Sequence, residues 1–180
     1  MDSLRMKRLL IWILMFVVGT ALTAQNKTLK EQIALLYTEA DLFLSEGDTD
    51  NACLSLEKLL RLDKSNRSNL YLALGGIAEQ KQKTNQAQNY YKKSISADKK
   101  SDKAYYSMGA LFYNQAIEIL ESIPSDEQTQ HVTETRQALI YLKKALPFLE
   151  QGFRLSGDKD IYQKPLNAVY QYLNLDKRIE

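Results

Sequence analysis

An internal repeat constrains the fold of this chain more than any other feature. The stretch NLYLALGGIAEQ, which begins at Asn69, aligns without gaps on KAYYSMGALFYN, which begins at Lys103. The two stretches share an aromatic residue, an apolar residue and then a glycine, so that Gly75 falls on Gly109, 34 positions later. A fixed period of 20 to 50 residues is typical of chains that stack similar supersecondary units.

A second pair of segments repeats at nearly the same distance. DNACLSLEKLLRLDKS, from Asp50, aligns on NQAQNYYKKSISADKK, from Asn85, and places Ala52 on Ala87, 35 positions later. The 180 residues include only 7 glycines and 3 prolines, and Leu, Ala, Lys, Gln and Glu favour helices. The sequence therefore predicts an all-α chain in which pairs of helices recur.

The residues at the repeated positions resemble the tetratricopeptide repeat. That motif has an aromatic residue, Leu-Gly and a further aromatic residue on its first helix, then Ala-x3-Phe on its second. In this chain the second copy supplies Tyr71, Leu74, Gly75, Ala78, Ala87 and Tyr91. The first copy departs from the motif at Glu39, where leucine is usual, and the proline that ends the motif is absent.

This resemblance implies a right-handed α-solenoid of about three helix–turn–helix repeats over residues 25–180. The repeats are expected near residues 33–66, 68–101 and 102–158, followed by a capping helix near 160–176. Gly75 and Gly109 would let the two helices of a pair approach closely, facing the small residues Ala87 and Ala145. Gly76 has no such packing role, and is either a tolerated defect or a thinner place in the concave wall.

The third repeat carries an insertion. Ala87 follows Gly75 by 12 positions, whereas Ala145 follows Gly109 by 36. The 24 additional residues, near 116–139, remain helix-like on both sides of a break at Pro124, where Ser125 and Gln128 form a capping-box pattern. We expect both helices of this pair to be about three turns longer, with a kink in the second at Pro147.

Residues 1–24 have the plan of a secretory signal peptide: three basic residues, an apolar run over 9–18, and small residues before a cut after Ala24. An exported, periplasmic or secreted protein is therefore expected. The alternative is a membrane-tethered chaperone or assembly accessory of the cell envelope that retains this segment as an anchor. Removing residues 1–24 takes away three basic residues and one acidic residue and leaves 21 of each sign, which argues against nucleic-acid binding.

No catalytic or metal-binding motif is present. Cys53 is the only cysteine and His131 the only histidine, so a zinc site of the usual composition cannot form within one chain. No nucleophile elbow, phosphate-binding loop or dinucleotide-binding turn appears. We therefore expect a protein that is not an enzyme and that needs no cofactor.

The resemblance implies binding of a protein or peptide in a concave groove lined by the first helices. Residues next to the core stripe are expected to face this groove, namely Tyr37, Asp41, Leu72, Glu79, Lys103, Tyr106 and Tyr113. Some family members hold a partner's carboxylate with a clamp of Lys, Asn and Arg, but here only Lys103 matches that clamp. A partner with apolar or aromatic anchors is expected; the alternative is that the tyrosines pack against one another or the neighbouring repeat and bind nothing.

Overall fold

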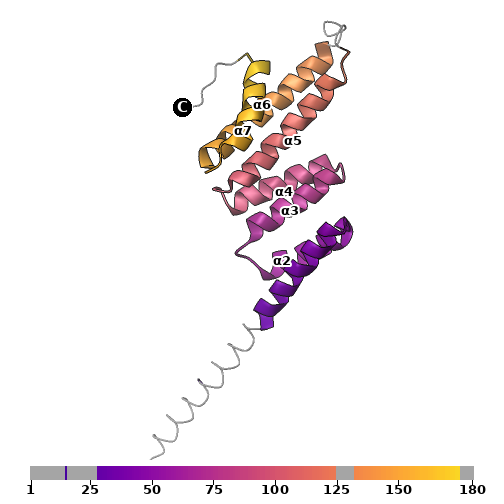
Figure 1. Ribbon diagram of the computed structural model, residues 1–180, viewed down its shortest axis with the longest axis vertical. Coiled ribbons are helices and arrows are strands. Elements are labelled where there is room, and N and C mark those ends of the chain that lie inside the picture. Colours follow the sequence, from indigo (N-terminus) through magenta and orange to yellow (C-terminus); the bar gives the residue numbers. More distant parts are fainter. Residues whose placement is uncertain (1–14, 16–27, 125–131, 175–180) are drawn as a thin grey trace, which may run out of the picture. The chain divides into compact units, whose positions relative to one another are not determined.

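The computed structural model describes residues 15, 28–124 and 132–174, and within these every regular element is a helix (Figure 1). The chain divides into two compact units, Met1–Lys64 and Ser65–Glu180. The predicted signal peptide, apart from Met15, lies outside the described residues, as do Ser125, Gln128 and His131. No described helix combines the length and apolar character needed to cross a membrane.

The first unit contains one helix pair, formed by a helix over residues 28–45 and by α2 (Thr49–Leu62). A tight turn joins them, and Gly47 adopts a φ of 76° there, a conformation that favours glycine. Asp48 caps α2 by accepting a hydrogen bond from the Asn51 backbone N–H at 3.1 Å. Ala40 of the first helix and Ala52 of α2, which aligns on Ala87, are both buried.

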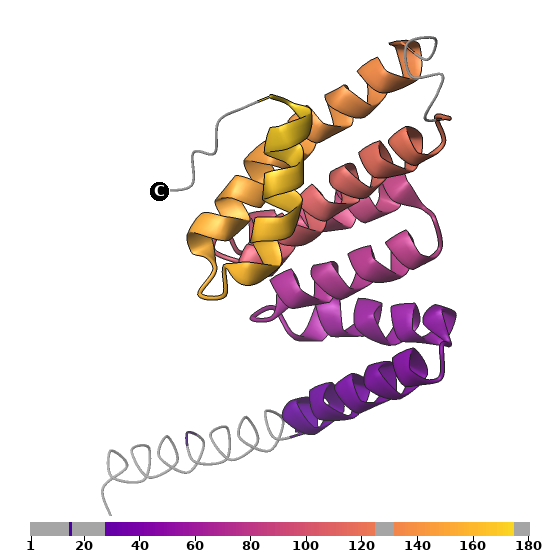
Figure 2. The same cartoon turned by 45° about the horizontal axis from the view of Figure 1, so that its top comes forward.

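The second unit begins with the pair α3 (Arg67–Gln80) and α4 (Thr84–Ala97), which pack against each other (Figure 2). Two serines connect the start of α3 with the end of α4. The Ser68 hydroxyl lies 3.0 Å from the Ser94 carbonyl oxygen, and the Ser94 hydroxyl donates to the Ser68 carbonyl at 2.7 Å. This reciprocal contact joins the open ends of the hairpin.

The next pair is longer, as the insertion predicts. Helix α5 (Asp102–Glu121) has 20 residues and α6 (Val132–Leu155) has 24, against 14 in each of α3 and α4. The two helices lie side by side, and Ala138 is buried within the added length. Helix α6 runs through Pro147 without interruption.

Helix α7 (Asp160–Tyr172) follows and packs against α6 and α5. Its side chain Tyr162 is fully buried, lies over Gly152 of α6, and donates a hydrogen bond to the Asp102 carbonyl oxygen at 2.9 Å. The structure thus confirms the predicted all-α fold of helix pairs with an elongated third pair.

The repeated glycines make close packing possible, but their nearest neighbours differ from the prediction. A Cβ atom added at Gly75 would lie 2.5 Å from Cδ1 of Tyr91, and one added at Gly109 would lie 2.7 Å from Cγ of Leu149. The expected neighbours were Ala87 and Ala145, one helical turn earlier on each second helix. The prediction paired small residues with small residues, whereas each glycine makes room for a large side chain.

Gly76 has no such contact. It is exposed, and a Cβ atom there would meet nothing within 4 Å. An exposed position is compatible with both interpretations of Gly76.

Candidate functional site

The second unit has a cleft on the face formed by α5 and the first half of α7. Its volume is about 490 Å³, within the range of sites that take small molecules or peptide side chains. Its lining consists of Glu79, Tyr106, Ser107, Ala110, Tyr113, Asn114, Lys164 and Pro165. Three of the predicted groove residues, Glu79, Tyr106 and Tyr113, therefore lie together.

The two tyrosines of the cleft are held in different ways. Tyr106 packs edge-on against the ring of Tyr162, with ring centroids 5.2 Å apart and planes at 85°. Tyr106 thus lines the cleft and also packs against a fully buried residue. Burial raises the pKa of Tyr113, and nearby Tyr172 and Glu121 raise it further, so its hydroxyl is protonated at neutral pH.

Glu79, which lines the cleft, is hydrogen-bonded to Tyr91, a core residue of the preceding repeat. The Tyr91 hydroxyl donates a hydrogen bond to Oε2 of Glu79 at 2.7 Å. Burial raises the pKa of Tyr91 well above its ordinary value, the hydrogen bond and charge of Glu79 raise it further, and a hydrogen bond with Ser107 opposes the change. Two residues of the cleft, Glu79 and Ser107, thus interact with one buried hydroxyl.

The remaining polar groups come from two helices. Ser107 and Asn114 are seven positions apart on α5, with the small Ala110 between them, and Lys164 comes from α7. An asparagine amide can both donate to and accept from a peptide backbone. Sequence reasoning missed Ser107, Asn114 and Lys164. The repeat period marks which face of α5 lines the groove, but it carries no information on where α7 packs.

A second hollow of about 610 Å³ adjoins the cleft and shares Tyr113 with it. It lies where the added lengths of α5 and α6 meet the end of α7. Its lining is mostly apolar and consists of Tyr113, Ile117, Leu120, Glu121, Ile123, Thr135, Leu139 and Tyr172. The insertion therefore contributes apolar surface beside the candidate site.

The other predicted groove residues lie elsewhere. Tyr37 and Asp41 belong to the first unit, where the Tyr37 hydroxyl donates to Oδ2 of Asp63 at 2.9 Å and Asp41 is exposed. Leu72 is partly buried and packs against the hydrophobic core. Lys103 is exposed near the start of α5 and is not among the residues that line the cleft.

The cleft has the composition of a binding surface. It presents two aromatic rings, a serine hydroxyl, an amide, one carboxylate and one cation. Among the described residues, no group of three or more His, Cys, Asp or Glu side chains is arranged to hold a metal ion.

Comparison with known proteins identifies the repeat. A family model described as "Tetratricopeptide repeat" matches residues 33–66 and 68–101. No curated protein sequence matches the chain significantly.

Among solved structures, the first TPR of Spaghetti (RPAP3) bound to an HSP90 peptide is similar with a TM-score of 0.57 at 17% identity. This match covers 80% of the present chain and 94% of the other. The TPR2B domain of yeast Sti1 in a complex with an Hsp70 peptide matches with a TM-score of 0.51 at 13% identity, over 78% and 97% of the two chains. Residues 33–66 and 68–101 are therefore tetratricopeptide repeats, and the two solved structures share the helical fold of the chain.

Proposed function

We propose that this protein is an exported, non-catalytic scaffold that binds a segment of a partner protein in the cleft between α5 and α7. The observation that carries the proposal is the composition of the cleft, in which Tyr106 and Tyr113 flank the small Ala110 next to an exposed Asn114. Tyrosine adds apolar contact area with little loss of conformational entropy, and its hydroxyl can bond a peptide backbone.

The lining favours a particular kind of segment. An apolar or aromatic side chain fits between the two tyrosine rings, where Ala110 leaves room for it. Asn114 and Ser107 can bond the main chain of an extended segment. Lys164 on α7 and Glu79 on α3 place one charge of each sign on the lining, so the apolar anchor and the main-chain contacts, and not net charge, select the segment.

The similar structures support a peptide ligand. The Spaghetti and Sti1 domains are described as complexes with HSP90 and Hsp70 peptides, and the tetratricopeptide fold is typically a protein-interaction module. The carboxylate clamp of some family members does not transfer, because Lys103, the one matching residue, does not line the cleft. The proposal for this chain therefore rests on aromatic and amide contacts.

The proposal can be tested with a photo-crosslinking amino acid placed at Ala110, inside the cleft, and at Lys103, outside it. Crosslinking from position 110 but not from position 103 is expected to recover a partner. Its binding to the purified chain is then measured with Tyr113→Ala and Asn114→Ala, alone and combined. An interface anchor often contributes about 2 kcal/mol or more, so the double variant should bind at least about tenfold more weakly.

Ile140→Ala provides the control, because Ile140 is an exposed residue of α6 that does not line the cleft. Helical content is compared by circular dichroism to show that each variant folds. A folded Tyr113→Ala, Asn114→Ala double variant that binds its partner as tightly as the parent chain would exclude the cleft as the binding site.

A further inference from the structure

Three positions on the first helix of each repeat form a face distinct from the cleft. In α3 these positions are Leu70, Leu74 and Ile77, and in α5 they are Ala104, Met108 and Leu111. All six residues are buried, and Leu70, Ile77, Ala104 and Leu111 expose 4% or less of their surface. The face is therefore covered wherever it occurs in the second unit.

The packing of α5 shows which interaction this face makes. Tyr105, Gly109 and Phe112 contact side chains of α6 within the same helix pair. Ala104 and Leu111 each precede one of these contacts by one position, about 100° around the helix. That rotation turns them away from α6, and α5 also packs against α4 of the preceding repeat. In α5, the face is therefore the one through which its repeat stacks on the repeat before it.

In the first repeat, no described residue covers the same face. The equivalent residues of the helix over 28–45 are Leu35, Glu39 and Leu42. Leu35 exposes 60% of its surface and Leu42 exposes 52%, whereas their counterparts in α3 and α5 are buried. Two large apolar side chains thus stand in solvent at positions that form a repeat-to-repeat interface elsewhere in the chain. A repeat stack leaves such a face at its end unless a polar cap replaces it.

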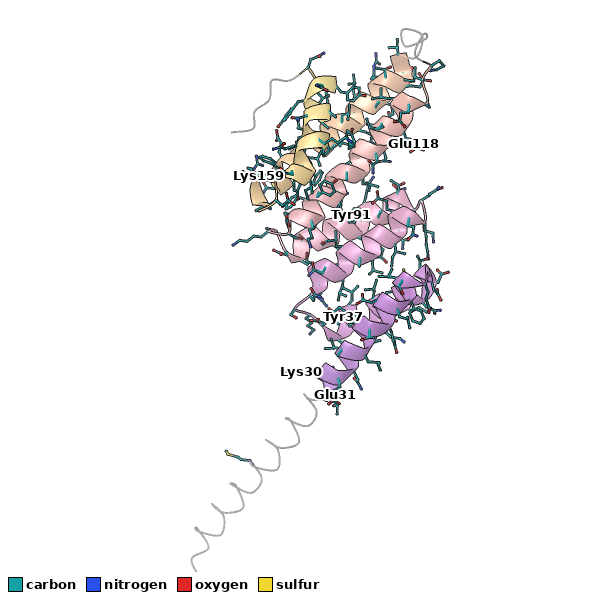
Figure 3. The ribbon with its side chains drawn as sticks, viewed as in Figure 1. Lys30, Glu31, Tyr37, Tyr91, Glu118 and Lys159 are labelled. Atoms are coloured by element: carbon teal, nitrogen blue, oxygen red, sulfur yellow. The ribbon has the colours of Figure 1, made fainter. Side chains whose placement is uncertain are left out.

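The charges around the two leucines restrict what can cover them. At 100° per residue, Glu31 and Glu39 lie about 40° from Leu35, one on each side, while Lys30 lies about 140° away. Figure 3 labels Lys30 and Glu31 near the beginning of this helix. The apolar face is therefore bordered by carboxylates on both sides and has no nearby cation of its own helix.

A second copy of the chain is a poor match for this face. Pairing two copies through Leu35 and Leu42 about a twofold axis, either parallel or antiparallel, brings Glu39 of one copy next to Glu39 of the other. Two like charges at the centre of an interface are destabilising. The occupant must supply a basic or hydrogen-bond-donating group opposite Glu39.

We infer that the Leu35–Leu42 face docks an amphipathic helix of another protein, one with apolar residues on one side and lysine or arginine beside them. This helix takes the position that α4 has against α5, and it extends the stack by one element. The inference concerns the first unit and does not depend on the cleft of the second unit or on the function proposed for it.

The test uses two labelled peptides as probes and the full chain as recovered from cells. Both probes are alanine-based helices of about 18 residues, long enough to hold helical structure, with leucines at helical spacing on one face. Lysines border the leucines in one probe and glutamates replace them in the other. Fluorescence anisotropy should show the lysine probe binding at least about tenfold more tightly than the glutamate probe.

Substitutions then identify the residues that bind the lysine probe. Leu35→Ala with Leu42→Ala should weaken binding of the lysine probe at least about tenfold, and Glu39→Leu should keep binding but reduce the preference for lysine. Leu54→Ala, at an exposed leucine of α2, is the matched control and should change nothing. Tyr113→Ala should also leave the affinity for the lysine probe unchanged, because Tyr113 lines the cleft and not this face.

Three results would overturn the inference. The first is absence of saturable binding of the lysine probe to the folded parent chain. The second is equal binding by the Leu35→Ala, Leu42→Ala variant, with helical content unchanged by circular dichroism. The third is a dimeric mass in solution that becomes monomeric on Leu35→Ala, which would assign the face to a second copy of the chain.

Discussion

Alanine substitutions at the two adjacent glycines of α3 would measure the free-energy cost of steric crowding at a close helix contact. Replacing either Gly75 or Gly76 by alanine removes the same backbone flexibility, and this favours the helix by about 0.5–1 kcal/mol. Only at Gly75 does the new Cβ atom meet another residue, the Tyr91 ring, with Cδ1 at 2.5 Å. Because that ring is buried and its hydroxyl is bonded to Glu79, it cannot move aside easily. Overpacking of this kind costs about 1–3 kcal/mol.

The gain in helix propensity is common to both variants, so the difference between them isolates the steric cost. Gly76→Ala should stabilise the chain by about 0.5–1 kcal/mol, and Gly75→Ala should be less stable than Gly76→Ala by about 1–3 kcal/mol. With a urea dependence of about 2 kcal/mol per molar, the midpoints monitored by circular dichroism at 222 nm should differ by about 0.5–1.5 M. Equal midpoints, or a more stable Gly75→Ala variant, would show that Tyr91 does not pack on Gly75 in solution.

Three further predictions concern stability, pH and export. Gly109→Leu should lower the free energy of unfolding by at least about 1–3 kcal/mol, because even a Cβ atom there would lie 3.1 Å from the Leu149 backbone nitrogen. His131→Ala should leave the free energy of unfolding nearly unchanged. Equal urea midpoints of the two variants would refute the repeat register. The pKa of Tyr91 is raised in the fold from its ordinary value of 10.0. The protonated Tyr91 therefore contributes fully to stability below pH 10, and this contribution falls at higher pH by up to about 1.4 kcal/mol per pH unit. Tyr91→Phe should make the loss of stability above pH 10, measured by urea unfolding, less steep. Trp12 is the only tryptophan, so a chain recovered from its native compartment after cleavage at Ala24 should show no tryptophan emission, whereas a mass that includes Trp12 would favour the membrane-tethered alternative.

The repeat period made the fold predictable because it fixes which residues share a face. Gly75 and Gly109, which the repeat aligns, are both buried, and so are the apolar residues before them, Leu74 and Met108. The same period placed Glu79, Tyr106 and Tyr113 on one side of the first helices, and all three line one cleft. Alignment of the repeats thus predicts on which side of each helix a residue lies.

Two features could not be read from the period. The side chain that fills the space over each glycine depends on the rotation and separation of the second helix, and a search for small residues selects Ala87 where Tyr91 is the actual neighbour. Lys164 enters the cleft because α7 packs against α5. That contact depends on the packing around Tyr162, which no repeated position specifies.

The tolerance of α3 for glycine also bears on the candidate site. Gly75 leaves room for the Tyr91 ring, and the ring in that position carries its hydroxyl to Glu79 on the cleft. A larger residue at position 75 would displace the ring and with it the hydrogen bond that orients Glu79. Gly75 lies in the buried stripe, yet its effect reaches the proposed binding surface through one aromatic side chain. Packing and binding therefore constrain this glycine together, while Gly76, which contacts neither the ring nor the cleft, is free to change.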